Sequence, residues 1–286
     1  MADRGAERQV LQHIHQEALI ELGKSLVRIP SFIGEETPIA RWVASYLAAR
    51  GYEVELQEVE PGWFQTVAIL KGTGRGRSLM FNGHLDINPL ASGWRRDPFD
   101  PWVEGNRLYG AGIRNMKIGS IIGGRGETYD LRSVSRNADL CTAFIAVSTV
   151  PGMTAETIRA DLEQRLNQLK REDPDFEYTL VHPIERKFKT WIPDHPPMEM
   201  PVDQAIVRTL VDSYRKITGQ APKRIGLPAS ELNARYGDDD AHLWEAGIPA
   251  PIYGPAGGSY GEDFAYIDEM VLCSQVLALT AFEIGA

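Results

Sequence analysis

The residues best suited to chemistry follow an apolar run at residues 78–83, where His84 and Asp86 stand two positions apart. In an extended chain, side chains two positions apart leave the same face, so the imidazole and the carboxylate can point together. Imidazole is a common ligand of transition metals, and a carboxylate that accepts a hydrogen bond from its other nitrogen fixes the orientation of the ring. The pair therefore indicates a metal site. The open alternative is a His and an Asp that cap a turn after a strand.

Acidic residues nearer the C-terminus could add oxygen ligands. Asp240 ends a run of three aspartates two positions before His242, and the alternative there is the start of a solvated helix. Glu262 and Asp263 could likewise bind a metal, or could form a negatively charged first turn of the last helix. A glycine-rich segment just before them is predicted to form a loop on the substrate side: Gly257, Gly258 and Ser259.

Hydrophobic periodicity predicts the elements that position these residues. Apolar stripes at helical spacing predict helices at residues 9–27, 38–50, 154–171, 202–218, 239–246 and 267–283. An alternating pattern predicts a half-exposed strand at 52–59, and apolar runs predict buried strands at 66–71, 78–83 and 250–253. Helices that lead into increasingly buried strands predict an α/β fold with a mostly parallel, helix-covered sheet.

The middle of the chain has a different pattern. Short β-rich stretches at 121–124 and 143–150, a helix and a further strand at 176–182 predict a small inserted α+β domain. A proline-rich segment at 192–201 is typical of a linker. We therefore expect three parts: residues 1–118 and 197–286 as two halves of one α/β domain, and residues 119–196 as the insertion.

Composition narrows the class of protein. The 286 residues carry 30 Lys and Arg against 39 Asp and Glu, a net charge of −9, which argues against nucleic-acid or anionic-membrane partners. Two cysteines, Cys141 and Cys273, are too few for a disulfide framework and suit a reducing compartment. Without a long apolar run or a secretory leader, the sequence predicts a soluble cytoplasmic protein.

A string of short motifs follows His84 and Asp86 and carries a family resemblance. It reads Gly93-Trp94, Asp97-Pro98-Phe99, Glu104-Gly105, Leu108-Tyr109-Gly110-Ala111-Gly112 and Asn115-Met116-Lys117. In this order the motifs resemble the zinc-dependent aminoacylase, acetylornithine deacetylase, succinyl-diaminopimelate desuccinylase and carboxypeptidase G family of metallopeptidases, called the deacylase family below. The resemblance implies a zinc-exopeptidase-like catalytic domain with a smaller lid domain that often mediates dimerisation.

The resemblance also implies a chemistry and a set of roles. Family members hold two zinc ions, and a metal-polarised water attacks an amide carbonyl with a Glu as general base. Carried over, His84 is a metal ligand, Asp86 is the catalytic-site carboxylate that orients it, and Asn115 stands where the family has a bridging Asp. An Asn amide has one oxygen acceptor and no charge, so it bridges two metals poorly. Manganese or cobalt would suit the same ligands.

The chain departs from the family after Lys117. No Glu-Glu pair lies between Lys117 and Pro201, so the segment with the family's general base is missing, as after an internal deletion with a truncated lid. Glu35-Glu36 precedes the second helix and is predicted to be a solvated helix start. Two functions are therefore open. The chain is either a metal-dependent hydrolase of a small N-acyl amino-acid-like substrate, or a shortened, silent relative that binds or dimerises or has no function.

Overall fold

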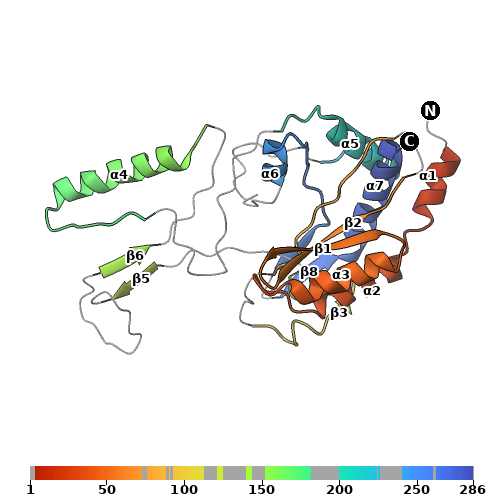
Figure 1. Cartoon of the computed structure of the whole chain (residues 1–286), viewed down its shortest axis with the longest axis horizontal. Helices are drawn as coiled ribbons and strands as arrows, with labels where there is room; N and C mark the ends of the chain where they lie inside the picture. The colour runs from red at the N-terminus through yellow and green to blue at the C-terminus, as the bar shows by residue number, and fades with distance from the viewer. Residues whose placement is uncertain are drawn as a thin grey trace.

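The computed structural model describes residues 4–72, 76–87, 90, 93–112, 121–124, 140–143, 152–181, 200–223, 225, 240–259 and 262–285. It mixes helices with short sheets, in agreement with the α/β class. Figure 1 shows most elements gathered around the C-terminal helix α7 (Ile267–Gly285), whereas α4 (Ala155–Glu172) lies apart beside β5 (Ile121–Gly124) and β6 (Leu140–Ala143). No helix within the described ranges is long and apolar enough to cross a membrane.

The N-terminal part contains two helices where the sequence predicts one at 9–27. They are α1 (Arg4–Leu11) and α2 (Gln16–Val27), and His15 begins the second helix with an extended backbone (φ −113°, ψ 124°). The break lets each helix pack separately against α7.

A helix and a hairpin follow in the predicted places. Helix α3 (Thr37–Ala48) is followed at Gly51 by a left-handed backbone with φ 85°, which suits a residue without Cβ. Strands β1 (Glu53–Glu60) and β2 (Trp63–Ile69) pair antiparallel around a two-residue turn. Helix α3 packs on this hairpin, and Thr66 Oγ1 donates to the carbonyl of Ala40 at 2.7 Å.

A four-stranded antiparallel sheet joins the middle of the chain to its end. Its order is β3 (Trp102–Glu104), β4 (Arg107–Tyr109), β8 (Asp263–Tyr266) and β7 (Gly257–Ser259). An aromatic core lies on it, where the rings of Trp102 and Tyr109 stack at 4.9 Å and Tyr109 contacts Phe264 at 5.5 Å. This core ties the motif string to the C-terminal segment.

Helix α7 is the other centre of packing. Val276 and Leu279 on it are fully buried, and α1, α2 and α5 (Ala205–Thr218) pack around it. Helix α5 ends where the sequence predicts, because Gly219 adopts φ 71° there. The short helix α6 (Asp240–Glu245) precedes the segment that leads to β7.

The middle part has the expected helix but little burial. Thr154 begins α4 through a capping box. The Thr154 hydroxyl accepts from the backbone N–H of Thr157, and the Thr157 hydroxyl accepts from the backbone N–H of Thr154. None of the residues of α4 is buried.

The prediction of a mostly parallel sheet is wrong for the described residues. Every pair of named strands among them is antiparallel, and the parallel contact there is an isolated bridge between Phe32 and Ile87. Two-residue turns join β1 to β2 and β3 to β4, and such short connections permit only antiparallel pairing.

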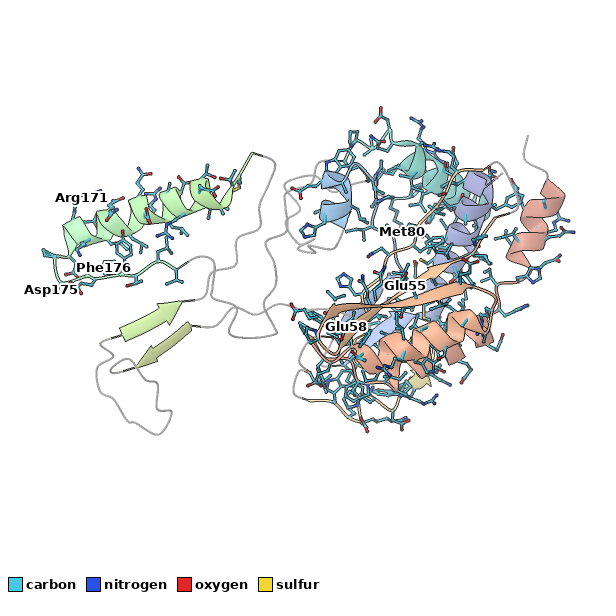
Figure 2. All side chains as sticks on the ribbon, in the orientation of Figure 1. Glu55, Glu58, Met80, Arg171, Asp175 and Phe176 are labelled. Carbon is cyan, nitrogen blue, oxygen red and sulfur yellow. The ribbon has the colours of Figure 1, made fainter. Side chains whose placement is uncertain are left out.

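Two strands that are predicted to be buried do not form. Residues 78–83 and 250–253 are assigned to no strand, and three of their large apolar side chains are exposed. Met80, labelled in Figure 2, is 56% exposed, and Phe81 and Ile252 are 61% and 58% exposed. Apolar runs predict burial only when a covering layer exists, and the described residues supply none here.

Candidate functional site

The pair predicted to do chemistry is formed. His84 Nδ1 lies 3.2 Å from Asp86 Oδ1, with the His84 side chain about half exposed (46%) and that of Asp86 at 26%. The hydrogen bond from His84 lowers the pKa of Asp86 more than partial burial raises it. The carboxylate is therefore ionised at neutral pH and orients the ring through Nδ1.

The pair is held in place by the residue that follows it. Ile87 donates its backbone N–H to the carbonyl of Ser31 at 2.8 Å and forms the parallel bridge with Phe32. Ser31 is 2% exposed, so this anchor is buried. The loop after α2 thereby fixes the position at which the segment with His84 and Asp86 ends.

The glycines of the motif string lie against the same anchor. A Cβ on Gly110 would clash with the side chain of Val27, and one on Gly112 would clash with that of Ile87. Gly112 also has φ 81°, a left-handed backbone that favours glycine. Through Ile87, the structure thus brings the end of the segment with His84 and Asp86 next to the glycine turn of the motif string, although about 25 residues separate them in the sequence.

Glu262 is not free to bind a metal. One of its carboxylate oxygens accepts the backbone N–H of Arg95 at 2.7 Å, and the other accepts Arg95 Nε at 2.7 Å. Burial raises the pKa of Glu262, but the hydrogen bonds and charge of Arg95, together with the charge of Arg96, outweigh burial. The pKa of Glu262 is therefore below its ordinary value. Both oxygens are committed to a structural ion pair, as is expected of a carboxylate with 8% exposure.

The expected first turn of the last helix lies elsewhere. Helix α7 begins at Ile267, so Asp263 belongs to β8, and Asp268 and Glu269 are the acidic residues of the first turn. The carbonyl of Asp263 accepts the N–H of Gly110 at 3.1 Å, which places this candidate beside the glycine turn.

The glycine-rich segment is a strand rather than a loop. Gly257, Gly258 and Ser259 form β7 and pair with Ala265, Phe264 and Asp263 of β8. A Cβ on Gly258 would lie 2.6 Å from the Phe264 ring, so glycine permits a close approach here. Their role beside a substrate stays a prediction.

Two predicted ligands cannot be placed. Asn115 lies outside the described residues, and Asp240 begins α6 without a described side chain. Among the residues that are described, no three His, Cys, Asp or Glu side chains come close enough to hold a metal ion. The described part thus supplies one imidazole and its orienting carboxylate, which do not by themselves complete a zinc site.

Sequence reasoning missed one buried carboxylate near the anchor. Glu36, predicted to be solvated, is only 6% exposed, and its Oε2 has no hydrogen-bond partner among the described atoms. It directly precedes α3 and its carbonyl accepts the N–H of Ala40. An acidic pair before a helix gives no signal in the sequence that would reveal the burial of its second member.

Comparisons with known proteins point to one group of enzymes. Over 112 residues, 37% of this chain, it is 36% identical to N-formyl-4-amino-5-aminomethyl-2-methylpyrimidine deformylase of Bacillus subtilis. Over 101 residues it is 34% identical to succinyl-diaminopimelate desuccinylase of Gluconobacter oxydans, and over 107 residues 34% identical to acetylornithine deacetylase of Salmonella paratyphi B. The resemblance to the deacylase family is confirmed over about a third of the chain.

The extent of this similarity is limited. The matches cover 26% of the deformylase, 26% of the desuccinylase and 28% of the deacetylase, so the chain spans about a quarter of the length of these relatives. No family model matches the chain. The similarity therefore supports relatedness to hydrolases of C–N bonds, whereas the activity of the whole chain is a separate question.

Proposed function

We propose that this chain is a metal-dependent hydrolase that cleaves the amide or a related C–N bond of a small N-acyl amino-acid-like substrate. The observation that carries the proposal is the 3.2 Å contact between His84 and Asp86, held by Ile87 against the glycine turn of the motif string. The related deformylase, desuccinylase and deacetylase support the reaction class.

In this proposal the chain's own residues bind and orient. Asp86 accepts a hydrogen bond from the Nδ1–H of His84 and so fixes the tautomer in which the other nitrogen carries a lone pair. That nitrogen is the metal ligand, and Asn115 is the second position that faces the metal. Asp240 and Asp263 are the remaining carboxylates that we propose as recruited ligands.

The proposed cofactor is one or two zinc ions, with manganese or cobalt as substitutes. When bound, such an ion supplies the positive charge that polarises a carbonyl and lowers the pKa of a water molecule. We further propose a zinc-exopeptidase-like catalytic domain at residues 1–118 and 197–286, a truncated lid at 119–196 that supports a homodimer, and a cytoplasmic location.

Hydrolysis of N-acetyl, N-succinyl and N-formyl amino acids tests the proposal directly. We expect release of the free amine that stops on treatment with a chelator and returns with added zinc. His84→Ala should abolish it, while His242→Ala on α6 should leave it unchanged. Activity that survives both the chelator and His84→Ala would exclude the proposed chemistry.

One observation favours the second candidate function, a silent relative that keeps the scaffold. The segments at 78–83 and 250–253 expose Met80, Phe81 and Ile252, although the sequence predicts that they are buried. An apolar surface of this kind suits a protein that associates through it. In that case the protein hydrolyses none of these substrates and binds no metal. The double variant Met80→Ser, Phe81→Ser then sediments as a smaller species than the unchanged protein.

A further inference from the structure

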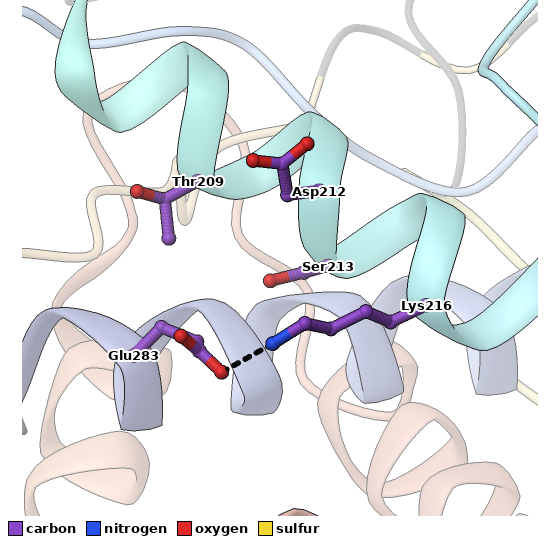
Figure 3. A pocket seen from close by; sticks show the side chains of 5 residues that line it. All are labelled: Thr209, Asp212, Ser213, Lys216 and Glu283. Atoms are coloured by element: carbon purple, nitrogen blue, oxygen red, sulfur yellow. Dashed lines mark hydrogen bonds and ion pairs between the residues drawn. The ribbon is translucent and has the colours of Figure 1, made fainter. Parts of the chain in front are cut away.

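A small polar cavity lies between α5 and α7, on elements that the proposed active site does not use. Its volume is about 170 Å³, which leaves room for several water molecules or a small organic molecule. The lining side chains come from both helices, as Figure 3 shows: Thr209, Asp212, Ser213, Lys216 and Glu283.

One buried polar atom in the lining has no partner. Ser213 is 1% exposed, and its Oγ makes no hydrogen bond within the described part of the chain. Figure 3 shows the hydroxyl directed into the space between the two helices. A buried hydroxyl without a partner loses the hydrogen bonds that it makes in water, so a molecule that accepts from it is favoured here.

The neighbouring ammonium is already engaged. Lys216 Nζ donates to Glu283 Oε1 at 2.6 Å and to Glu7 Oε1 at 2.7 Å, which ties α5 to α7 and α1. These hydrogen bonds, the one to Glu283 first and then the one to Glu7, raise the pKa of Lys216, so the ammonium stays charged. The second oxygen of Glu283 has no described donor and faces the same region as the cavity.

The charges around the cavity do not balance. The lining holds two carboxylates, Asp212 and Glu283, and one ammonium, that of Lys216. Arg215, which pairs with Asp212 at 3.3 Å, lies outside the lining. The local sum is therefore −1. A monovalent cation is complementary to this sum, and an anion is repelled. A coordinated metal is disfavoured, since no cluster of three ligating side chains occurs among the described residues.

We infer that the cavity binds a small primary amine that also carries a hydroxyl or carbonyl oxygen. Its ammonium group donates to the free oxygen of Glu283 and to Asp212 at the rim. Its oxygen accepts from Ser213 Oγ and so satisfies the buried hydroxyl. This site is independent of the proposed hydrolysis, so binding of an amine here and hydrolysis at His84 are tested separately.

Calorimetric titration of the full chain with 2-aminoethanol tests the inference. We expect saturable binding in the millimolar range and an increase in the melting temperature. Ethylene glycol lacks the charge, glycolate has the opposite charge, and sodium chloride supplies a cation without a hydrogen-bond donor. None of the three should bind saturably.

Two variants distinguish the site from a general ionic effect. Ser213→Ala removes a hydroxyl that has no partner, so the free protein should not melt earlier, while 2-aminoethanol should bind about three- to tenfold more weakly. Glu283→Gln should weaken binding at least about tenfold. Ser274→Ala is the matched control, because its hydroxyl on α7 already donates to the carbonyl of Met270 at 2.9 Å.

Three results would overturn the inference. One is the absence of saturable binding of 2-aminoethanol at millimolar concentration. Another is equal binding of ethylene glycol, which would mean that the cavity takes up water and neutral solutes only. The last is unchanged affinity in Ser213→Ala.

Discussion

Glu262 and Arg95, which are 167 positions apart in the sequence, form a two-point contact. Both carboxylate oxygens accept hydrogen bonds from Arg95 at 2.7 Å, one from the backbone and one from Nε. The guanidinium also lies 5.9 Å from the centre of the Trp102 ring. The contact therefore fastens the end of the chain to the motif string, and it removes Glu262 from the set of metal ligands.

The first prediction concerns this contact. Glu262→Ala should lower the melting temperature by about 2–6 °C, because it leaves the backbone N–H and Nε of Arg95 without acceptors. Metal content should be unchanged. Glu104→Ala is the control, since Glu104 binds the same guanidinium at 3.3 Å and is exposed. An equal decrease in both variants would contradict a special role for Glu262.

The second prediction concerns Asp86. Asp86→Asn keeps the size of the side chain but removes the charge that orients His84, so zinc affinity should fall about 10- to 100-fold. Elemental analysis and competition with a chromophoric chelator measure this. Asp263→Asn is the comparison. If Asp263→Asn reduces affinity as much as Asp86→Asn, Asp86 has no distinct orienting role.

The pKa of Asp86 adds a pH dependence. Its pKa is lowered from the ordinary value of 3.8, mainly by the hydrogen bond from His84. A lowered pKa in the folded state means that the stability it contributes is present above pH 3.8 and is lost as the pH falls through the folded-state value. Acid unfolding followed by fluorescence should therefore be less steep below this pH in Asp86→Asn.

The third prediction concerns the close pairing of β7 with β8. Gly257→Ala should destabilise the protein by about 1–3 kcal/mol, because its Cβ would meet the backbone carbonyl of Phe264, which cannot rotate away. Gly254→Ala, three residues earlier, is the control, since its Cβ would have no neighbour within 4 Å. Urea unfolding measures both. Equal stability of the two variants would show that β7 does not pack as described.

The fourth prediction concerns alkaline pH. Burial, and to a smaller extent the charge of Glu269, raises the pKa of Cys273 from 9.0 to about 11. The raised pKa means that its contribution is present below pH 9 and is lost as the pH rises toward 11. We expect a loss of about 1–3 kcal/mol over this interval, which Cys273→Ala should lack. Cys141→Ala should retain the loss of stability. If the Cys141→Ala variant lacks the loss, the effect belongs to Cys141 instead.

The local elements follow largely from the sequence. The helices at α3, α4, α5 and α7, the strand β1 and the end of α5 at Gly219 lie within a few residues of their predicted places. These features depend on periodicity and on glycine backbone preferences, which neighbouring residues determine. The contact between His84 and Asp86 is equally local, since two positions in an extended chain bring the side chains to one face.

Long-range relationships depended on the tertiary structure. The sequence alone determined the family resemblance and the pair His84 and Asp86, because both depend on order and spacing along the chain. Only the structure decided that Glu262 binds Arg95, that Glu36 is buried, that the described strands pair antiparallel and that Met80 and Phe81 are exposed. Hydrophobicity shows which side chains gain from burial, but the segments that cover them are separated by many residues, so their presence or absence is decided by packing.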